Sequence, residues 1–100
     1  MVLAITDSNE CDFAIKFDDA NLIDKVKELA KIGLGTWYQA AHDDKTNEYF
    51  TEEEVGAFYG SGYAEPTSEL LDRFGIKHEI IDIEVDEDDN IINCDEVMWL

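Results

Sequence analysis

The sequence predicts a single α+β domain in which two β-hairpins flank about three helices, in the order ββ-ααα-ββ. Two observations support this class. Apolar and polar residues alternate with a period of two near both ends of the chain, and apolar residues follow helical spacing between them. We therefore expect one domain over residues 1–100, with the helices packed on one face of an antiparallel sheet formed by the two hairpins.

The hairpins are predicted from the alternation and from the polar turns that interrupt it. The first hairpin pairs residues 2–6 with residues 11–17. The second pairs residues 78–85 with residues 91–99 across an acidic turn at 87–90. In the strand before that turn, Ile81, Ile83 and Val85 are expected to point inward, and the acids that alternate with them, from Asp82 to Asp86, outward.

The first helix is predicted between two capping signals. Asp18 and Asp19 are suitable N-caps, the apolar stripe runs over residues 22–32, and Gly33 is expected to end the helix. Residues 34–41 carry mixed signals, because glycine and threonine weaken a helix there while glutamine and two alanines weaken a strand. We assign this segment to a helix.

Two further helices have clearer boundaries. Thr51 followed by three glutamates is a capping-box start for a short helix that ends at Gly60. Pro66 fits the first turn of the last helix, and Gly75 is expected to stop it. Together with the first helix, these segments fill the space between the hairpins.

Net charge is the unusual feature of the composition. The chain has 25 acidic residues and 7 lysines and arginines, which give a formal net charge of -18. Residues 32–100 hold eighteen of these acids and only three basic residues, Lys45, Arg73 and Lys77. Nucleic acids and anionic membranes are bound through Lys and Arg, so this chain is expected to be repelled by both. It should instead attract a basic protein that binds nucleic acid.

The acids that would meet such a partner are clustered. Asp82, Glu84 and Asp86 alternate along a predicted strand, so their carboxylates would recur about every 6.6 Å, and the following turn extends the row. A solvated sheet face would show the same alternation, but several clusters with few lysines favour partner binding. Glu52 to Glu54 form a second cluster, and the tyrosines that follow it suit contact with Arg and Lys. The candidate partner-binding residues are Asp82, Glu84, Asp86, Asp88, Asp89, Glu52, Glu53, Glu54, Tyr59 and Tyr63.

Motifs for catalysis or for a bound metal are weak. The Gly60–Gly62 segment is too short for a phosphate loop, and neither His42 nor His78 has an evident nucleophile in the sequence. Residues 86–90 begin like a calcium loop, but Ile91 stands where that loop requires glycine. We therefore expect no enzyme activity, no catalytic residue, no metal ligand and no cofactor.

In size, charge and lack of catalytic motifs, the chain resembles the small acidic proteins that phages use against host defence. That group includes DNA-mimicking antirestriction proteins, uracil-DNA glycosylase inhibitors and anti-CRISPR proteins. The resemblance concerns overall character and no shared motif, so it transfers no functional residue. It implies an inhibitor that occupies the nucleic-acid-binding surface of a nuclease, a restriction enzyme or a CRISPR complex.

The alternative is a structural or assembly protein of a phage or mobile element, whose acidity serves solubility and which binds through the apolar residues 97–100. No apolar stretch reaches the roughly 20 residues that span a bilayer, and the first residues lack a basic leader. A cytoplasmic location is expected, in the host cell if the protein is phage-encoded. Cys11 and Cys94 are expected to be reduced core thiols, and the sequence leaves open both their proximity and a homodimer.

Overall fold

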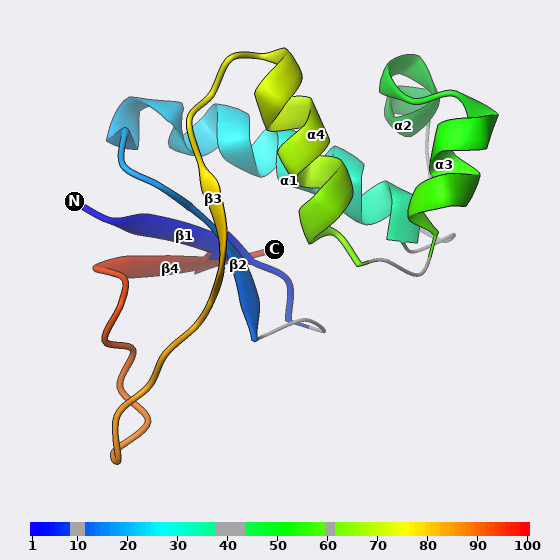
Figure 1. Ribbon diagram of the computed structural model, residues 1–100. Helices are drawn as coiled ribbons and strands as arrows, with labels where there is room; N and C mark the ends of the chain where they lie inside the picture. The colour runs from blue at the N-terminus through cyan, green and yellow to red at the C-terminus, as the bar shows by residue number, and fades with distance from the viewer. Residues whose placement is uncertain (9–11, 38–43, 60–61) are drawn as a thin grey trace.

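The computed structural model describes residues 1–8, 12–37, 44–59 and 62–100, and it confirms the α+β class (Figure 1). The helices lie on one side of a four-stranded sheet, in a molecule measuring 42 × 26 × 16 Å. In chain order the elements are β1 (Leu3–Thr6), β2 (Phe13–Phe17), the 3-10 helix η1 (Ala20–Leu22), α1 (Ile23–Trp37), α2 (Asp44–Tyr49), α3 (Glu52–Phe58), α4 (Ala64–Arg73), β3 (Glu79–Asp82) and β4 (Glu96–Trp99). Cys11, His42 and parts of the predicted turn at residues 7–10 and of the segments 34–41 and 51–60 fall outside the described residues. Cys94 is described and is only half-buried, so it is not the core thiol that was expected.

The sheet is mixed, whereas the sequence predicted an antiparallel one. Its strand order is β3-β2-β1-β4, with β2 antiparallel to both neighbours and β4 parallel to β1. The predicted pairing of the last two strands is therefore wrong, because β3 and β4 occupy opposite edges of the sheet. The chain between them does meet near the turn, at the isolated antiparallel bridge between Val85 and Ile91. β4 makes its backbone hydrogen bonds with β1, and β3 makes its own with β2. In a hairpin, β3 and β4 would have exchanged these bonds with each other.

The core forms between one face of the sheet and the helices α1 and α4. Register places Leu3 opposite Phe17 and Ile5 opposite Ile15, so these four side chains share the helix-facing side of the sheet. The helices contribute apolar stripes of their own, as the amphipathic spacing predicts. The fully buried helix residues in this cluster are Val26, Leu29, Ala30, Leu70 and Leu71.

Helix α1 runs past the glycine that was expected to end it. Asp19 caps the amino-terminal turn, as predicted, by accepting a hydrogen bond from the backbone N–H of Asn21. Gly33 lies in the interior of the helix and is buried, and an added Cβ there would lie 2.2 Å from Oγ1 of Thr67 on α4. Gly33 is thus a site of close helix crossing, which explains a glycine at this position without a helix stop.

The later helix boundaries agree better with the sequence. Thr51 and Glu54 form a complete capping box at the start of α3, although the helix ends at Phe58. Gly75 follows α4 with a φ of +69°, and two backbone bonds close the helix end, as expected for a glycine stop. The short helix α2 was not predicted. In the part of the chain that the structure describes, no helix combines the length and apolar character needed to span a membrane.

Candidate partner-binding surface

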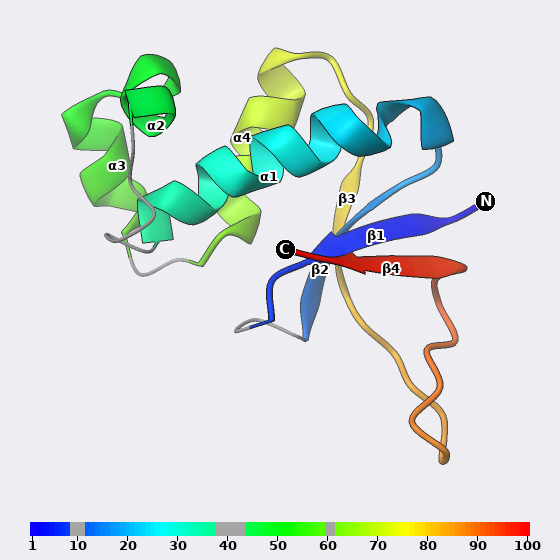
Figure 2. The same ribbon diagram turned by 180° about the vertical axis from the view of Figure 1, so that it is seen from behind.

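The segment of residues 82–96, here called the acidic loop, carries the densest negative charge in the described chain. It leaves the edge strand β3, extends away from the sheet on the side opposite the helices, and returns to β4 (Figure 1, Figure 2). All of its acidic side chains are exposed, and it contains no Lys, Arg or His. These acids are Asp82, Glu84, Asp86, Glu87, Asp88, Asp89, Asp95 and Glu96.

The tip of the acidic loop is a small ordered turn. The backbone N–H of Asp86 donates to the carbonyl of Asn90 at 2.9 Å, and one carboxylate oxygen of Asp86 accepts from the N–H groups of Asp88 and Asn90 at 2.9 Å each. Asp89 takes the left-handed conformation, with a φ of +62°. The bond from the Asn90 N–H is the main cause that holds the pKa of Asp86 below its ordinary value. Asp86 therefore shapes the turn and remains ionised at neutral pH.

Both ends of the acidic loop are tied to the sheet. Asn93 accepts from the N–H of Glu84 at 3.1 Å and donates its side-chain amide to the carbonyl of Asp82 at 2.8 Å. On the returning side, the carboxylate of Asp95 accepts from the N–H of Val2 at 2.6 Å, and the Asp95 N–H donates to the Val2 carbonyl at 2.8 Å. These bonds hold the loop in one ordered shape, and such pre-organisation lowers the entropy that a loop loses in any binding event.

The expected strand row of carboxylates is not formed. β3 ends at Asp82, so Glu84 and Asp86 do not continue the pleat that would set a regular spacing. Val85, expected to point inward, is 49% exposed, because it pairs with Ile91 beyond the edge of the sheet. The acids Asp88 and Asp89 do lie in the adjoining turn, so the structure brings this cluster together around a loop instead of along a strand.

The second predicted cluster, Glu52 to Glu54, lies at the far end of the molecule from the acidic loop (Figure 1). Glu52 and Glu53 are exposed in the first turn of α3, where acids suit the helix dipole. Glu54 is already engaged: Oε1 accepts from the Thr51 N–H, and Oε2 accepts from Arg73 at 2.7 Å. A single partner surface therefore does not include all the predicted acids.

Only one of the two predicted interface tyrosines, Tyr59 and Tyr63, lies on the surface. Tyr59 is 65% exposed, beside the end of α3, and stays available for contact. Tyr63 is fully buried, which contradicts its place among the interface candidates. Its hydroxyl donates to the backbone carbonyl of Ile5 at 2.7 Å and lies 3.3 Å from that of Phe13, so it fixes α4 to the sheet. Nothing in the local sequence distinguishes the two residues.

Sequence reasoning also missed a serine beside His78. Ser68 on α4 places Oγ 2.6 Å from Nε2 of His78, and Nδ1 of the ring lies 2.8 Å from the carbonyl of Ile76. In the neutral ring Nδ1 donates to that carbonyl and Nε2 accepts from Ser68. Both ring nitrogens are thereby occupied, and the pair ties α4 to the start of β3. The two residues stand ten apart in sequence, too far for a spacing rule to reveal.

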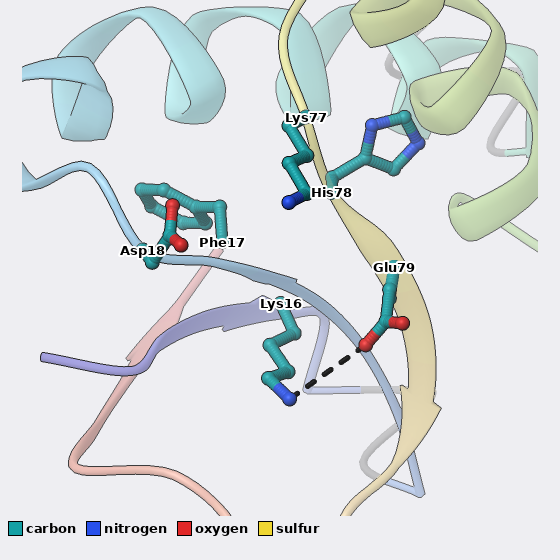
Figure 3. Close-up of a pocket in the computed structure, with 6 residues that line it drawn as sticks. All are labelled: Lys16, Phe17, Asp18, Lys77, His78 and Glu79. Carbon is teal, nitrogen blue, oxygen red and sulfur yellow. Dashed lines mark ion pairs between the residues drawn. The ribbon is translucent and has the colours of Figure 1, made fainter.

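A pocket of about 230 Å³ lies next to this pair, where β2 ends and β3 begins (Figure 3). Lys16 and Glu79, both in its lining, form an ion pair at 3.6 Å. Lys77 and Asp18 add one more charge of each sign, so the lining is electrically balanced. Within the described ranges, no group of three potential ligands is placed to hold a metal ion. The pocket therefore offers no excess of charge to attract an ionic ligand.

No protein-family model, curated protein or solved structure matches the chain. The functional assignment therefore depends on the surface itself.

Proposed function

We propose that the chain is an acidic inhibitor that binds a basic nucleic-acid-handling protein, such as a nuclease, a restriction enzyme or a CRISPR complex, through the acidic loop. The observation that supports this most directly is the run of eight exposed acids, with no basic residue among them, on a loop that projects from the sheet. It acts in the cytoplasm, where such targets operate. Binding would block access of nucleic acid to the basic surface of the target.

The charge of the loop acts mainly on the rate of association. One exposed ion pair contributes only about 0–1 kcal/mol, so no single acid accounts for tight binding. Several like charges within about one Debye length, roughly 8 Å at physiological salt, act together and raise association rates by about 10–10³-fold. Asp86 contributes to this field as well, because its hydrogen bonds to the turn leave the carboxylate exposed and ionised. We therefore expect fast, salt-sensitive binding.

The test is a pull-down from a bacterial lysate that contains restriction and CRISPR machinery, with and without competing duplex DNA. The proposal predicts capture of a basic nucleic-acid-binding protein, released by DNA or by high salt. A matched pair of triple reversals locates the surface. Reversal of Glu84, Glu87 and Asp88 to lysine removes loop charge without touching the carboxylate of Asp86, which builds the turn.

The control triple reverses Asp24, Glu48 and Glu65, which are exposed on the helical side of the molecule and outside the candidate clusters. Both triples change the net charge equally, so a general effect of charge would weaken capture equally. Loss of capture with the loop triple alone supports the proposed surface. Equal capture by the loop triple and the parent chain would exclude it.

The second candidate, an assembly protein, is favoured by exposed apolar side chains near the carboxyl end. Ile92 is 61% exposed and Trp99 is 52% exposed. Met98 and Leu100, by contrast, pack against the core, so only part of the predicted apolar end is available. Capture that resists both DNA and high salt, or a mass that rises with concentration, would favour assembly over inhibition.

A further inference from the structure

The strand β4 forms an edge of the sheet, and its backbone has an unused side. The N–H of Glu96 donates to the Val2 carbonyl, and the N–H of Leu100 donates to the Thr6 carbonyl. In a parallel ladder, bonds to one neighbour come from alternate residues. The N–H and C=O groups of Val97 and Trp99 therefore point away from β1, and no described strand pairs with them.

The opposite edge of the sheet is less accessible. On β3 the outward-pointing groups belong to Ile80 and Asp82, because the N–H of Ile83 donates inward to the carbonyl of Asp12. The side-chain amide of Asn93 already donates to the outward carbonyl of Asp82. A strand added at β3 would have to displace this bond, whereas none of the described residues bonds to the outward backbone groups of Val97 and Trp99 on β4.

Side chains on β4 provide an anchor beside the open edge. Val97 pairs with Ala4, and Trp99 pairs with Thr6, so both project from the sheet face opposite the helices. Trp99 is 52% exposed and Val97 is half-buried. A half-exposed indole next to free backbone groups is the combination that strand addition uses, with hydrogen bonds for affinity and side chains for specificity.

Charge decides which strand can bind. Asp95 and Glu96 stand at the start of β4, directly after the rest of the acidic loop. A second copy of the chain would bring another net charge of -18 to this edge and would be repelled. We infer that β4 accepts an extended, cationic segment of the partner protein as a fifth strand, beside the acidic loop. This inference rests on the proposed function and names its mode of contact.

Two synthetic peptides test the inference. One alternates lysine and valine and can extend as a strand, and the other alternates lysine and proline at equal charge but cannot form a ladder. Amide hydrogen exchange of the full chain is followed by NMR at low salt. We expect the lysine–valine peptide to slow exchange at Val97 and Trp99 by about tenfold or more, because ordered backbone bonds protect amides. The lysine–proline peptide should leave both amides fast.

The outcomes distinguish failure of strand addition from failure of the proposed function. If both peptides bind equally and the amides of β4 are unchanged, attraction by the acidic loop stands and strand addition is overturned. If neither peptide binds, both the charge-based function and the strand addition are overturned. Slowed exchange at Val97 and Trp99 in the lysine–valine complex alone supports both the charge-based function and strand addition.

Two single proline variants, one at each edge of the sheet, provide a second test of strand addition. Val97→Pro removes an outward N–H at the β4 edge, and Ile80→Pro removes one at the β3 edge. Loss of one backbone bond should weaken binding of the lysine–valine peptide about fivefold for Val97→Pro, and Ile80→Pro should bind like the parent. Equal binding by both variants would contradict the inference. If Val97→Pro fails to fold, the exchange measurement on the parent chain still decides.

Discussion

Replacing Gly33 with alanine tests the closest contact between the two core helices. The new Cβ would lie 2.2 Å from Oγ1 of Thr67, 2.9 Å from its backbone nitrogen and 3.1 Å from its Cα. Rotation of the Thr67 side chain cannot relieve this, because the backbone atoms stay in place and the buried hydroxyl donates to the Tyr63 carbonyl at 2.6 Å. The helices α1 and α4 must therefore move apart.

Two opposing contributions set the change in the free energy of unfolding that Gly33→Ala causes. Alanine is favoured over glycine inside a helix by about 1 kcal/mol. Overpacking of a close-packed interior costs about 1–3 kcal/mol, and a clash with backbone belongs at the upper end of this range. We expect Gly33→Ala to lower the free energy of unfolding by about 1–2 kcal/mol. For a chain of this size, that corresponds to a fall in Tm of about 4–16 °C.

Urea unfolding followed by far-UV circular dichroism measures this difference. Gly56→Ala is the matched control, since Gly56 lies in α3 with open space around the position of a Cβ. In the control only the higher helix propensity of alanine acts, so its free energy of unfolding should rise by about 0.5–1 kcal/mol. If Gly33→Ala proves as stable as the parent chain, the helices do not cross as closely as described.

Two further predictions concern buried and paired groups. Tyr63→Phe should lower the free energy of unfolding by about 1–3 kcal/mol in the same assay, because the buried carbonyl of Ile5 loses a donor; an unchanged midpoint would mean that the bond does not support the fold. Arg73→Ala should reduce stability at neutral pH, and the difference from the parent should narrow as pH falls below about 4. The bonds from Thr51 and Arg73 lower the pKa of Glu54, so this stabilisation is present above the unfolded-state pKa and is lost as the carboxylate protonates. A gap that is constant with pH would contradict the pairing.

Local signals in the sequence were sufficient for most helix ends, and tertiary contacts decided the exceptions. The capping box at Thr51 and the glycine stop at Gly75 involve groups within a few residues, so spacing reveals them. Gly33 looks identical to a stop in sequence, but the approach of Thr67 from another helix gives it a different role. The strands near the carboxyl end were predictable as strands, but alternation does not specify which neighbour each one joins.

The candidate surface was predictable to a similar extent. Acids between turn residues are exposed in almost any fold, so the charge of the acidic loop followed from composition and pattern. The pairing of Glu54 with Arg73 joins residues 19 apart, and the hydroxyl of Tyr63 reaches a carbonyl 58 residues away. Neither contact has a local signature. The sequence therefore identified where charge is abundant but not which groups the fold itself uses.

The acids that the fold uses differ from those that remain free to meet a partner. Glu54 and Asp86 are acids with structural partners, since each accepts hydrogen bonds that shape its own segment. Glu87 lies beside Asp86 at the tip of the acidic loop, is exposed, and repels its neighbours. Charge repulsion of this kind disfavours the compact state and is not required by the mixed sheet or its helices. The proposed function gives a role to acids that oppose folding and gather on one ordered, projecting loop, because the cationic surface of the proposed partner would compensate their repulsion.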